Sequence, residues 1–381
     1  MITIVHSSDW HLGRSFHNVS LLDDQAIWLE QILQQVIEQQ ADALIIAGDL
    51  YDRSVPPAAA VALFDQFIER FRCQSQAKLI VISGNHDSAT RLGFAANQLK
   101  HKGIHFITSF DDMLEPIIVS NASGEQAFVY GIPYCEPLQV RHHYQCHVSH
   151  HAQAHQFLVE QIKATLDESQ SNVLVSHCFV DGASGCDSER PLSIGGSDAV
   201  AWEPMQNFTY VALGHLHGAQ YRGAKHIRYS GSPMAYSFSE QHHKKGCCLV
   251  LIDNEGLANV EQLPLQPKRR MRVVEGRMAE LIEQAKEDPN ADDYLMVRLT
   301  DTHAIMDAMN KLRSVYPNIL HLEKPGMLGQ IPNRPQANDQ IKQSELSMFA
   351  DFYQQSLGRE LTHEQRSLLT ELLTDLHKQD V

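Results

Sequence analysis

Short polar motifs along the chain combine carboxylate, imidazole and amide side chains, which are the groups that metal-dependent hydrolases use. In Gly84-Asn85-His86-Asp87, the amide oxygen of Asn85 can bind a metal ion and His86 can give or take a proton. The full set of donors is Asp9, His11, Asp49, Asn85, His177, His215 and His217. These seven donors are too many for one zinc ion and include no cysteine, so they predict two divalent ions. Mixed oxygen and imidazole donors favour manganese, with iron or zinc as alternatives.

Two neighbouring ions need a carboxylate that binds both, and we expect Asp49 to be that group because it follows Gly48 at the end of a central strand. One ion would be bound by Asp9, His11, Asp49 and His217, and the other by Asp49, Asn85, His177 and His215. Such ions, about 3.5–4 Å apart, bind a phosphate and activate a water molecule for in-line attack. His86 is expected to contact the phosphate and to protonate the leaving oxygen, with Asp87 orienting its ring.

Five apolar segments with the composition of buried strands end at these motifs. They are residues 2–5, 43–47, 78–83, 173–175 and 208–213. The first three alternate with amphipathic helical patterns, which predicts a βαβαβ unit and an α/β fold. Ligands bind outside the carboxyl ends of parallel strands. We therefore expect the five ends to meet at one site.

Shorter strands are predicted further along the chain. Residues 116–119 and 127–133 form a predicted hairpin, and residues 227–233 and 247–253 suggest a second sheet packed on the first. Between these pairs, segment 141–155 is rich in histidine, and segment 181–198 has the Gly, Ser and Asp content of a loop.

The histidine-rich segment allows two interpretations. On one helix, His143, His147 and His151 would share a face, which could form a second metal site. A solvated helix or loop is the simpler interpretation, because no carboxylate or cysteine completes a ligand set there.

The last third of the sequence suggests a smaller α/β unit, a linker and a helical tail. The unit follows the basic segment 268–272, which is either a solvated connection or a DNA contact. Residues 326–342 have the Pro, Gly, Asn and Gln content of a linker. Amphipathic helices are predicted at 344–356 and 362–378, and they are too short to bury much of a core alone. We expect them to dock on this chain or on the helices of a partner.

The composition limits the function classes. A net charge of −15 argues against a free-standing nucleic-acid binder, although bound ions or a basic partner chain could supply positive charge. No apolar segment approaches the roughly 20 residues that span a bilayer, and no leader segment is evident, so we expect a cytoplasmic protein without a membrane partner. Seven cysteines without a CxxC pair predict free thiols.

Taken together, the motifs resemble those of the calcineurin-like metallophosphoesterase superfamily. They are DxH at Asp9 and His11, GDxxD at 48–52, GNHD at 84–87, the isolated His177 and GHLH at 214–217. Longer strings, at 9–14, 210–217 and 227–233, resemble the SbcD family, the nuclease subunits of bacterial SbcCD complexes. Archaeal and eukaryotic members of this group carry a histidine where Asp52 stands, so we expect Asp52 to act behind the ligands, orienting His86.

The resemblance implies a four-layer α/β/β/α nuclease domain at residues 1–270, a small capping domain at 271–325, the linker, and a helical tail at 343–381. That tail would bind an SbcC-like ATPase of the Rad50 type. The implied activities are ATP-dependent double-strand exonuclease and single-strand or hairpin endonuclease hydrolysis, in DNA repair, recombination and replication. A homodimer within a heterotetramer is also implied.

Two other functions remain open from the sequence. A stand-alone phosphomonoesterase or phosphodiesterase would use the same metal core but would not need the last 110 or so residues. A non-catalytic scaffold that bridges DNA ends would need neither a complete ligand set nor the proton donor His86.

Overall fold

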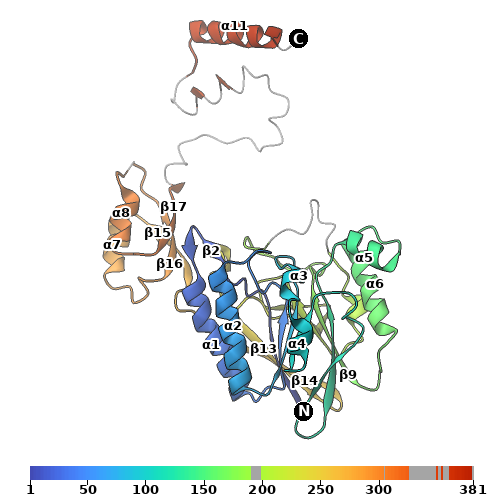
Figure 1. Ribbon diagram of the computed structural model, residues 1–381. Helices are drawn as coiled ribbons and strands as arrows, with labels where there is room; N and C mark the ends of the chain where they lie inside the picture. Colours follow the sequence, from blue (N-terminus) through green and yellow to red (C-terminus); the bar gives the residue numbers. More distant parts are fainter. Residues whose placement is uncertain (190–198, 304, 326–348, 351–352, 355–359, 380–381) are drawn as a thin grey trace.

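A computed structural model of the chain describes residues 1–189, 199–303, 305–325, 349–350, 353–354 and 360–379 (Figure 1). Within this part of the chain, two six-stranded sheets pack face to face, and a separate three-stranded sheet follows them.

The first sheet contains the predicted βαβαβ unit. Its order is β14 (Gly256–Pro264), β13 (Gly246–Asp253), β1 (Ile2–Ser7), β4 (Ala43–Ala47), β5 (Lys78–Ile82) and β6 (Ile104–Ile107). Strands β1, β4, β5 and β6 run parallel, so their carboxyl ends lie at one edge. Helices α1 (Leu22–Glu38) and α2 (Ala58–Gln74) cover the outer face, where Trp10 packs edge-on against Trp28, Phe64 and Phe67.

The second sheet repeats this arrangement with different edges. Its order is β11 (Gln220–Arg222), β12 (Ala224–Tyr229), β10 (Tyr210–Gly214), β9 (Ser171–His177), β8 (Gln126–Ile132) and β7 (Ile117–Ser120). The four central strands are parallel, and β7 and β11 are antiparallel to their neighbours. Helices α5 (Pro137–Tyr144) and α6 (His151–Lys163) lie on its outer side (Figure 1).

The two sheets meet through a fully apolar layer. Ile4, Ile45 and Ile80 from the first sheet pack against Val175 and Ala212 from the second, and all are fully buried. A strand covered on both faces is apolar along its whole length, which explains why these segments show no alternation in the sequence. The layers therefore run helix, sheet, sheet, helix, as predicted for the α/β/β/α core.

One prediction about these layers was wrong, and one of the interpretations left open for the histidine-rich segment does not hold. Strand β13 joins the first sheet, antiparallel to β1, instead of following β12 into the second. It is almost entirely buried and is shielded by β14, so it fits an interior position beside β1. The shared face of His143, His147 and His151 is also not formed, because α5 ends at Tyr144, with Gln145 left-handed at φ +52°, and α6 begins at His151.

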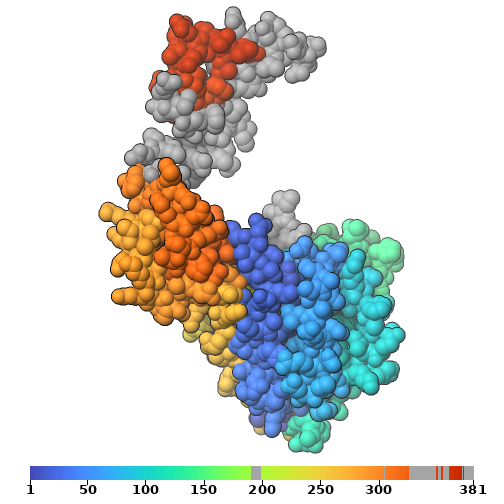
Figure 2. Space-filling view, turned by 60° about the vertical axis from the view of Figure 1, so that its left-hand side comes forward, coloured from blue at the N-terminus to red at the C-terminus, as the bar shows by residue number. Residues whose placement is uncertain are grey.

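The third sheet belongs to the predicted smaller unit. Its parallel strands are β15 (Met271–Gly276), β16 (Tyr294–Leu299) and β17 (Ile319–Glu323), with helices α7 (Met278–Ala285) and α8 (Ala308–Arg313) on one face. Met271, Tyr294 and Met296 join the core cluster of the first sheet. Figure 2 shows this orange unit against the blue N-terminal segments.

The basic segment 268–272 holds this unit in place. Arg269 donates to Asp24, a buried carboxylate on α1, and pairs with Asp292. Arg272 pairs with Asp288 and Asp293. These two arginines are therefore committed to contacts within the chain, which supports the structural interpretation of the segment.

Smaller elements complete the described chain. They are β2 (Ser15–Phe16), β3 (Val19–Ser20), α3 (Ala89–Leu92), α4 (Ala96–Lys100), the 3-10 turns Glu203–Met205 and Phe238–Glu240, and α11 (His363–Gln379). A capping box precedes α11, since Thr362 and Gln365 exchange side-chain to backbone hydrogen bonds. The predicted linker 326–342 and most of the predicted helix 344–356 lie outside the described residues. Of the helices described, none is long and apolar enough to cross a membrane.

Candidate metal centre

The five predicted strand ends meet at one place, between the carboxyl edges of the two large sheets. Strands β1, β4 and β5 are neighbours in the first sheet, and β9 and β10 are neighbours in the second. Strand β4 contacts both β9 and β10 across the layer. The loops after these strands bring together all seven predicted ligands, of which only Asn85 is partly exposed.

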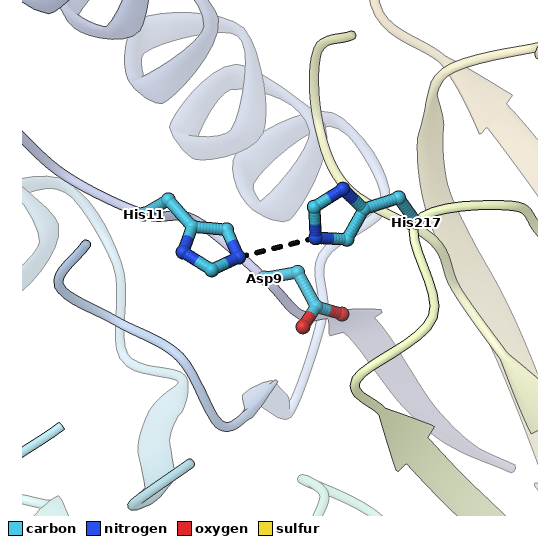
Figure 3. Close-up of side chains that lie close together, drawn as sticks. All are labelled: Asp9, His11 and His217. Atoms are coloured by element: carbon cyan, nitrogen blue, oxygen red, sulfur yellow. Dashed lines mark hydrogen bonds between the residues drawn. The ribbon is translucent and has the colours of Figure 1, made fainter. Parts of the chain in front are cut away.

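One half of the site is formed by Asp9, His11 and His217, and we call it the His11 side. Ligand atoms of these three residues all lie within 4.8 Å of one another (Figure 3). His11 Nε2 lies 3.1 Å from His217 Nε2, a contact that either a shared proton or a cation can hold. Burial lowers the pKa of His11 well below its usual value, so the ring is neutral and suited to binding a metal ion.

The other half is formed by Asn85, His177 and His215, and we call it the His177 side. Asn85 Oδ1 lies 2.9 Å from His177 Nε2 and 3.3 Å from His215 Nδ1. Burial lowers the pKa of His215 to about 3. Burial also disfavours charge on His177, but the Asp49 carboxylate outweighs it and raises the pKa of His177 to about 9.

Asp49 lies between the two halves, as expected for a bridging ligand. Its Oδ2 atom is 3.7 Å from His11 Nε2 and 3.4 Å from His177 Nε2. Its other oxygen, Oδ1, accepts a hydrogen bond from the backbone N–H of His86 at 2.8 Å. One carboxylate thus faces both imidazole groups while the adjacent loop fixes its orientation.

Unusual backbone geometry gives the loops their shape. Asp9, His11, Asp49 and His215 all have positive φ, which non-glycine residues adopt mainly where the surroundings impose it. Gly48 has φ +91°, and a Cβ there would collide with His177 Nδ1. The chain therefore needs glycine before Asp49 so that the two sheets can approach this closely.

His86 lies beside the ligands and is partly exposed. Its Nδ1 is 2.7 Å from the backbone carbonyl of Asp52. A carbonyl only accepts, so Nδ1 carries a proton and Nε2 is the nitrogen left to exchange one. The prediction that residue 52 orients His86 agrees with this contact, but the contact is made by the backbone. The Asp52 carboxylate instead accepts from Arg14 at 3.1 Å.

The predicted role of Asp87 does not agree with the structure. Its carboxylate accepts hydrogen bonds from the backbone N–H groups of Gly84, Leu50 and Tyr51, at 2.9–3.0 Å. No hydrogen bond joins it to His86 among the described contacts. Asp87 thus ties the loop after β5 to the loop after β4, because those amides would otherwise be unpaired.

Sequence reasoning missed four polar residues around His217. Ser188, Glu189, Glu240 and Lys245 all contact it, and Glu189 Oε1 accepts from its backbone N–H at 2.7 Å. The first two lie in the predicted loop 181–198, of which 190–198 is outside the described residues. The available sequence signal was the oppositely charged pair Glu240 and Lys245, which lie five residues apart just before the buried strand β13. No motif marks this pair as part of a site.

The histidine-rich segment 141–155 contributes no ligands to this site. In the part of the chain that the structure describes, the groups of histidine, cysteine and carboxylate close enough to hold a metal ion contain none of its residues.

The chain is similar to known proteins along most of its length. Residues 2–219 match the model of the calcineurin-like phosphoesterase family, and residues 267–356 match a family described as the type 5 capsule protein repressor C-terminal domain. The chain is 33% identical, over 97% of its length and 98% of the relative, to the SbcD subunit of the nuclease SbcCD from Staphylococcus epidermidis.

Two solved structures show weaker similarity. A dimetal phosphatase from Danio rerio has 11% identity and a TM-score of 0.39, and a hypothetical protein from Thermus thermophilus has 9% identity and a TM-score of 0.37. Each match covers 70% of this chain and 99% of the other. At these TM-scores we base no argument on them.

Proposed function

Since the chain belongs to the SbcD family of calcineurin-like phosphoesterases, we propose that it is a metal-dependent phosphodiesterase that cleaves DNA. The observation that carries the proposal is the convergence of seven oxygen and nitrogen donors from five strand ends around Asp49. The relative that the chain resembles over almost its whole length is a nuclease by name.

The donor set fits two divalent ions. Asp9, His11, Asp49 and His217 would hold one ion, and Asp49, Asn85, His177 and His215 would hold the other. When bound, such a pair neutralises phosphate charge and activates the attacking water. Manganese is the ion we propose, because the donors are carboxylate, amide and imidazole without a thiolate.

The protein's own contribution to the reaction is orientation and proton transfer. His86 is partly exposed beside the ligands, and its Nδ1 is fixed by the Asp52 carbonyl. Its Nε2 can therefore hold a proton for the leaving oxygen. We propose His86 as the catalytic acid and Asp87 as the residue that holds its loop.

The partners and finer activities follow from the family. We propose that residues 271–325 cap the site, that 326–342 are a linker, and that tail 343–381 docks on an SbcC-like ATPase. The match of residues 267–356 to a separate C-terminal family supports a boundary near residue 270, and the naming of the relative as one subunit of a nuclease supports a partner subunit. ATP-dependent exonuclease activity on duplex ends and endonuclease activity on single strands and hairpins are the activities to test.

We propose that the chain forms a homodimer. Three large apolar side chains of the first domain are exposed: Val55 before α2 (59%), Val61 in α2 (44%) and Phe94 after α3 (82%). We place the dimer surface at these side chains, because exposed large apolar groups mark interaction surfaces. Light scattering should show a dimer for wild type and a monomer for the double variant Val61→Asp, Phe94→Asp. A wild-type monomer contradicts the proposal.

The test of the function uses the purified chain with manganese, alone and with its SbcC-like partner and ATP. The substrates are a labelled hairpin DNA and a small chromogenic phosphodiester. Hairpin cleavage that rises with partner and ATP supports the nuclease. If the small ester is hydrolysed but DNA is not cleaved, even with the partner present, the chain is a general phosphodiesterase and not a nuclease.

A further inference from the structure

A buried charged pair lies directly behind the metal-ligand candidate His217. Glu240 is 1% exposed and Lys245 is 9% exposed. Lys245 Nζ donates to Glu240 Oε2, to Ser232 Oγ at 2.9 Å and to the His217 carbonyl at 2.8 Å. All three ammonium hydrogens therefore have acceptors, and Glu240 is kept ionised by its partner.

Ser188 connects this pair to the imidazole ring. Its Oγ lies 2.5 Å from Glu240 Oε1 and 2.8 Å from His217 Nδ1. Glu240 Oε1 is also 3.5 Å from His217 Nδ1. Ser188 itself is held from the other side, because Arg14 donates to its backbone carbonyl at 3.2 Å.

The direction of these hydrogen bonds follows from the chemistry of the groups. An ionised carboxylate only accepts, so the Ser188 hydroxyl must donate to Glu240. The hydroxyl oxygen is then left to accept, and His217 Nδ1 must carry the proton that it accepts. The other ring nitrogen, Nε2, consequently presents its lone pair on the His11 side, 3.1 Å from His11 Nε2.

We propose that Ser188 and Glu240, fixed by Lys245, are positioning residues that hold His217 in the Nδ1-protonated tautomer required for metal binding. The proposal rests on the two-ion site of the proposed function and names residues that act behind it. Partners of this kind orient the imidazole and raise its basicity, and their loss commonly weakens metal binding by about 10–100-fold.

Ser188→Ala is the sharpest variant, because it removes one hydroxyl and leaves the buried ion pair intact. Ser239→Ala is the matched control. Ser239 lies in the same region and bonds to Ser237 Oγ at 2.8 Å and to the backbone N–H of Asp187 at 3.2 Å, but it has no bond to His217. Ser188→Thr keeps the hydroxyl and should restore the wild-type behaviour.

Two readouts separate positioning from a merely structural role. Manganese titration followed by electron paramagnetic resonance should show one of two ions binding about tenfold more weakly in Ser188→Ala. Long-range proton–nitrogen NMR of the metal-free protein should show His217 Nδ1 protonated in wild type and a mixture of tautomers in the variant. Thermal unfolding in EDTA should match that of Ser239→Ala.

A second variant tests Glu240 itself. Glu240→Gln combined with Lys245→Met removes both charges and so leaves no buried unpaired ion. This double variant should also bind one of the two manganese ions tenfold or more weakly than wild type does. If both variants retain wild-type metal affinity and tautomer, the positioning role is overturned. If wild type binds no manganese at all, the proposed function fails, while the NMR result still decides the tautomer.

Discussion

The two halves of the candidate metal centre hold their histidines in different ways. On the His177 side, His177 Nδ1 lies 2.9 Å from the backbone carbonyl of Ala47, in strand β4 of the opposite sheet. On the His11 side, His217 Nδ1 is held by the side chains of Ser188 and Glu240. Both arrangements place an acceptor behind Nδ1 and leave Nε2 facing the site.

The difference determines which half can be altered separately. A carbonyl within a sheet cannot be removed by a side-chain substitution, so the His177 side depends on how closely the two sheets pack. The His11 side depends on side chains from the loop at 181–189 and the turn before β13. We therefore expect the His11 side to be sensitive to side-chain changes and the His177 side to backbone changes.

Asp49→Ala should have the largest effect, because the Asp49 carboxylate faces imidazole groups of both halves. We expect manganese binding at both positions to be lost and DNA cleavage to fall to background. That loss exceeds the roughly 10²–10⁴-fold that a single proton donor supplies. The measurements are metal stoichiometry and cleavage rate, with exposed Asp65→Ala as the control. Retention of two tightly bound ions in Asp49→Ala would show that Asp49 does not bridge.

His86→Ala should have the next largest effect on DNA cleavage, but it should not change metal binding in either half. Cleavage should fall about 10²–10⁴-fold because the proposed proton donor is gone. Metal binding should not change, because His86 touches Asp49 only through its backbone N–H. The exposed His101→Ala is the control. Loss of a metal ion in His86→Ala would instead make His86 a ligand, in the group it forms with His11 and Asp52.

Gly48→Ala should damage the His177 side specifically. The added Cβ would collide with His177 Nδ1, at a residue with φ +91°. We expect one ion to bind more than about tenfold more weakly and the free energy of unfolding to fall by at least about 1 kcal/mol. Gly124→Ala is a matched control, because Gly124 has φ +83° and no atom within 4 Å of the added Cβ. Equal effects of the two substitutions would assign the damage to backbone strain and not to His177.

Much of the candidate metal centre can be predicted from the sequence, because each ligand adjoins a buried apolar strand. The motifs at Asp9, Asp49, Asn85, His177 and His215 mark strand ends, and parallel strands bring such ends together. The grouping of ligands around Asp49 could be inferred in this way. The capping box at Thr362 was also predictable, because it is formed within four residues.

The remaining features depend on contacts that sequence proximity does not indicate. Asp87 is adjacent to His86, yet its carboxylate turns back to Gly84 and across to Leu50 and Tyr51. Strand β13 follows β12 in the chain but pairs with β1. Ser188 and Glu240 meet across 52 residues, so only the fold reveals that they converge on His217.

The last prediction concerns acid stability and the buried groups that lie behind the two halves. His155 on α6 lies behind the His177 side, with its Nε2 2.9 Å from the hydroxyl of Ser176. Burial lowers the pKa of His155 to about 4. Behind the His11 side, Glu240 is buried, but its pKa is held well below the usual value because Lys245 and His217 outweigh the effect of burial. Of these two groups, only His155 should lower the free energy of unfolding as the pH falls from 6.5 to 4.5.

The sign follows from proton binding. Below pH 6.5, His155 takes up a proton in the unfolded chain but not in the folded one, so stability falls as the pH falls. From pH 7 to 5, this group should remove about 2 kcal/mol from the free energy of unfolding. Urea denaturation of metal-free protein at both pH values measures it. His155→Gln keeps a hydrogen-bond partner for Ser176 but cannot take up this proton. Between pH 7 and 5, its free energy of unfolding should therefore fall by about 2 kcal/mol less than that of wild type. The control His142→Gln, at an exposed position, should behave as wild type. Equal acid sensitivity in wild type and His155→Gln would mean that His155 does not contribute to the loss of stability at acid pH.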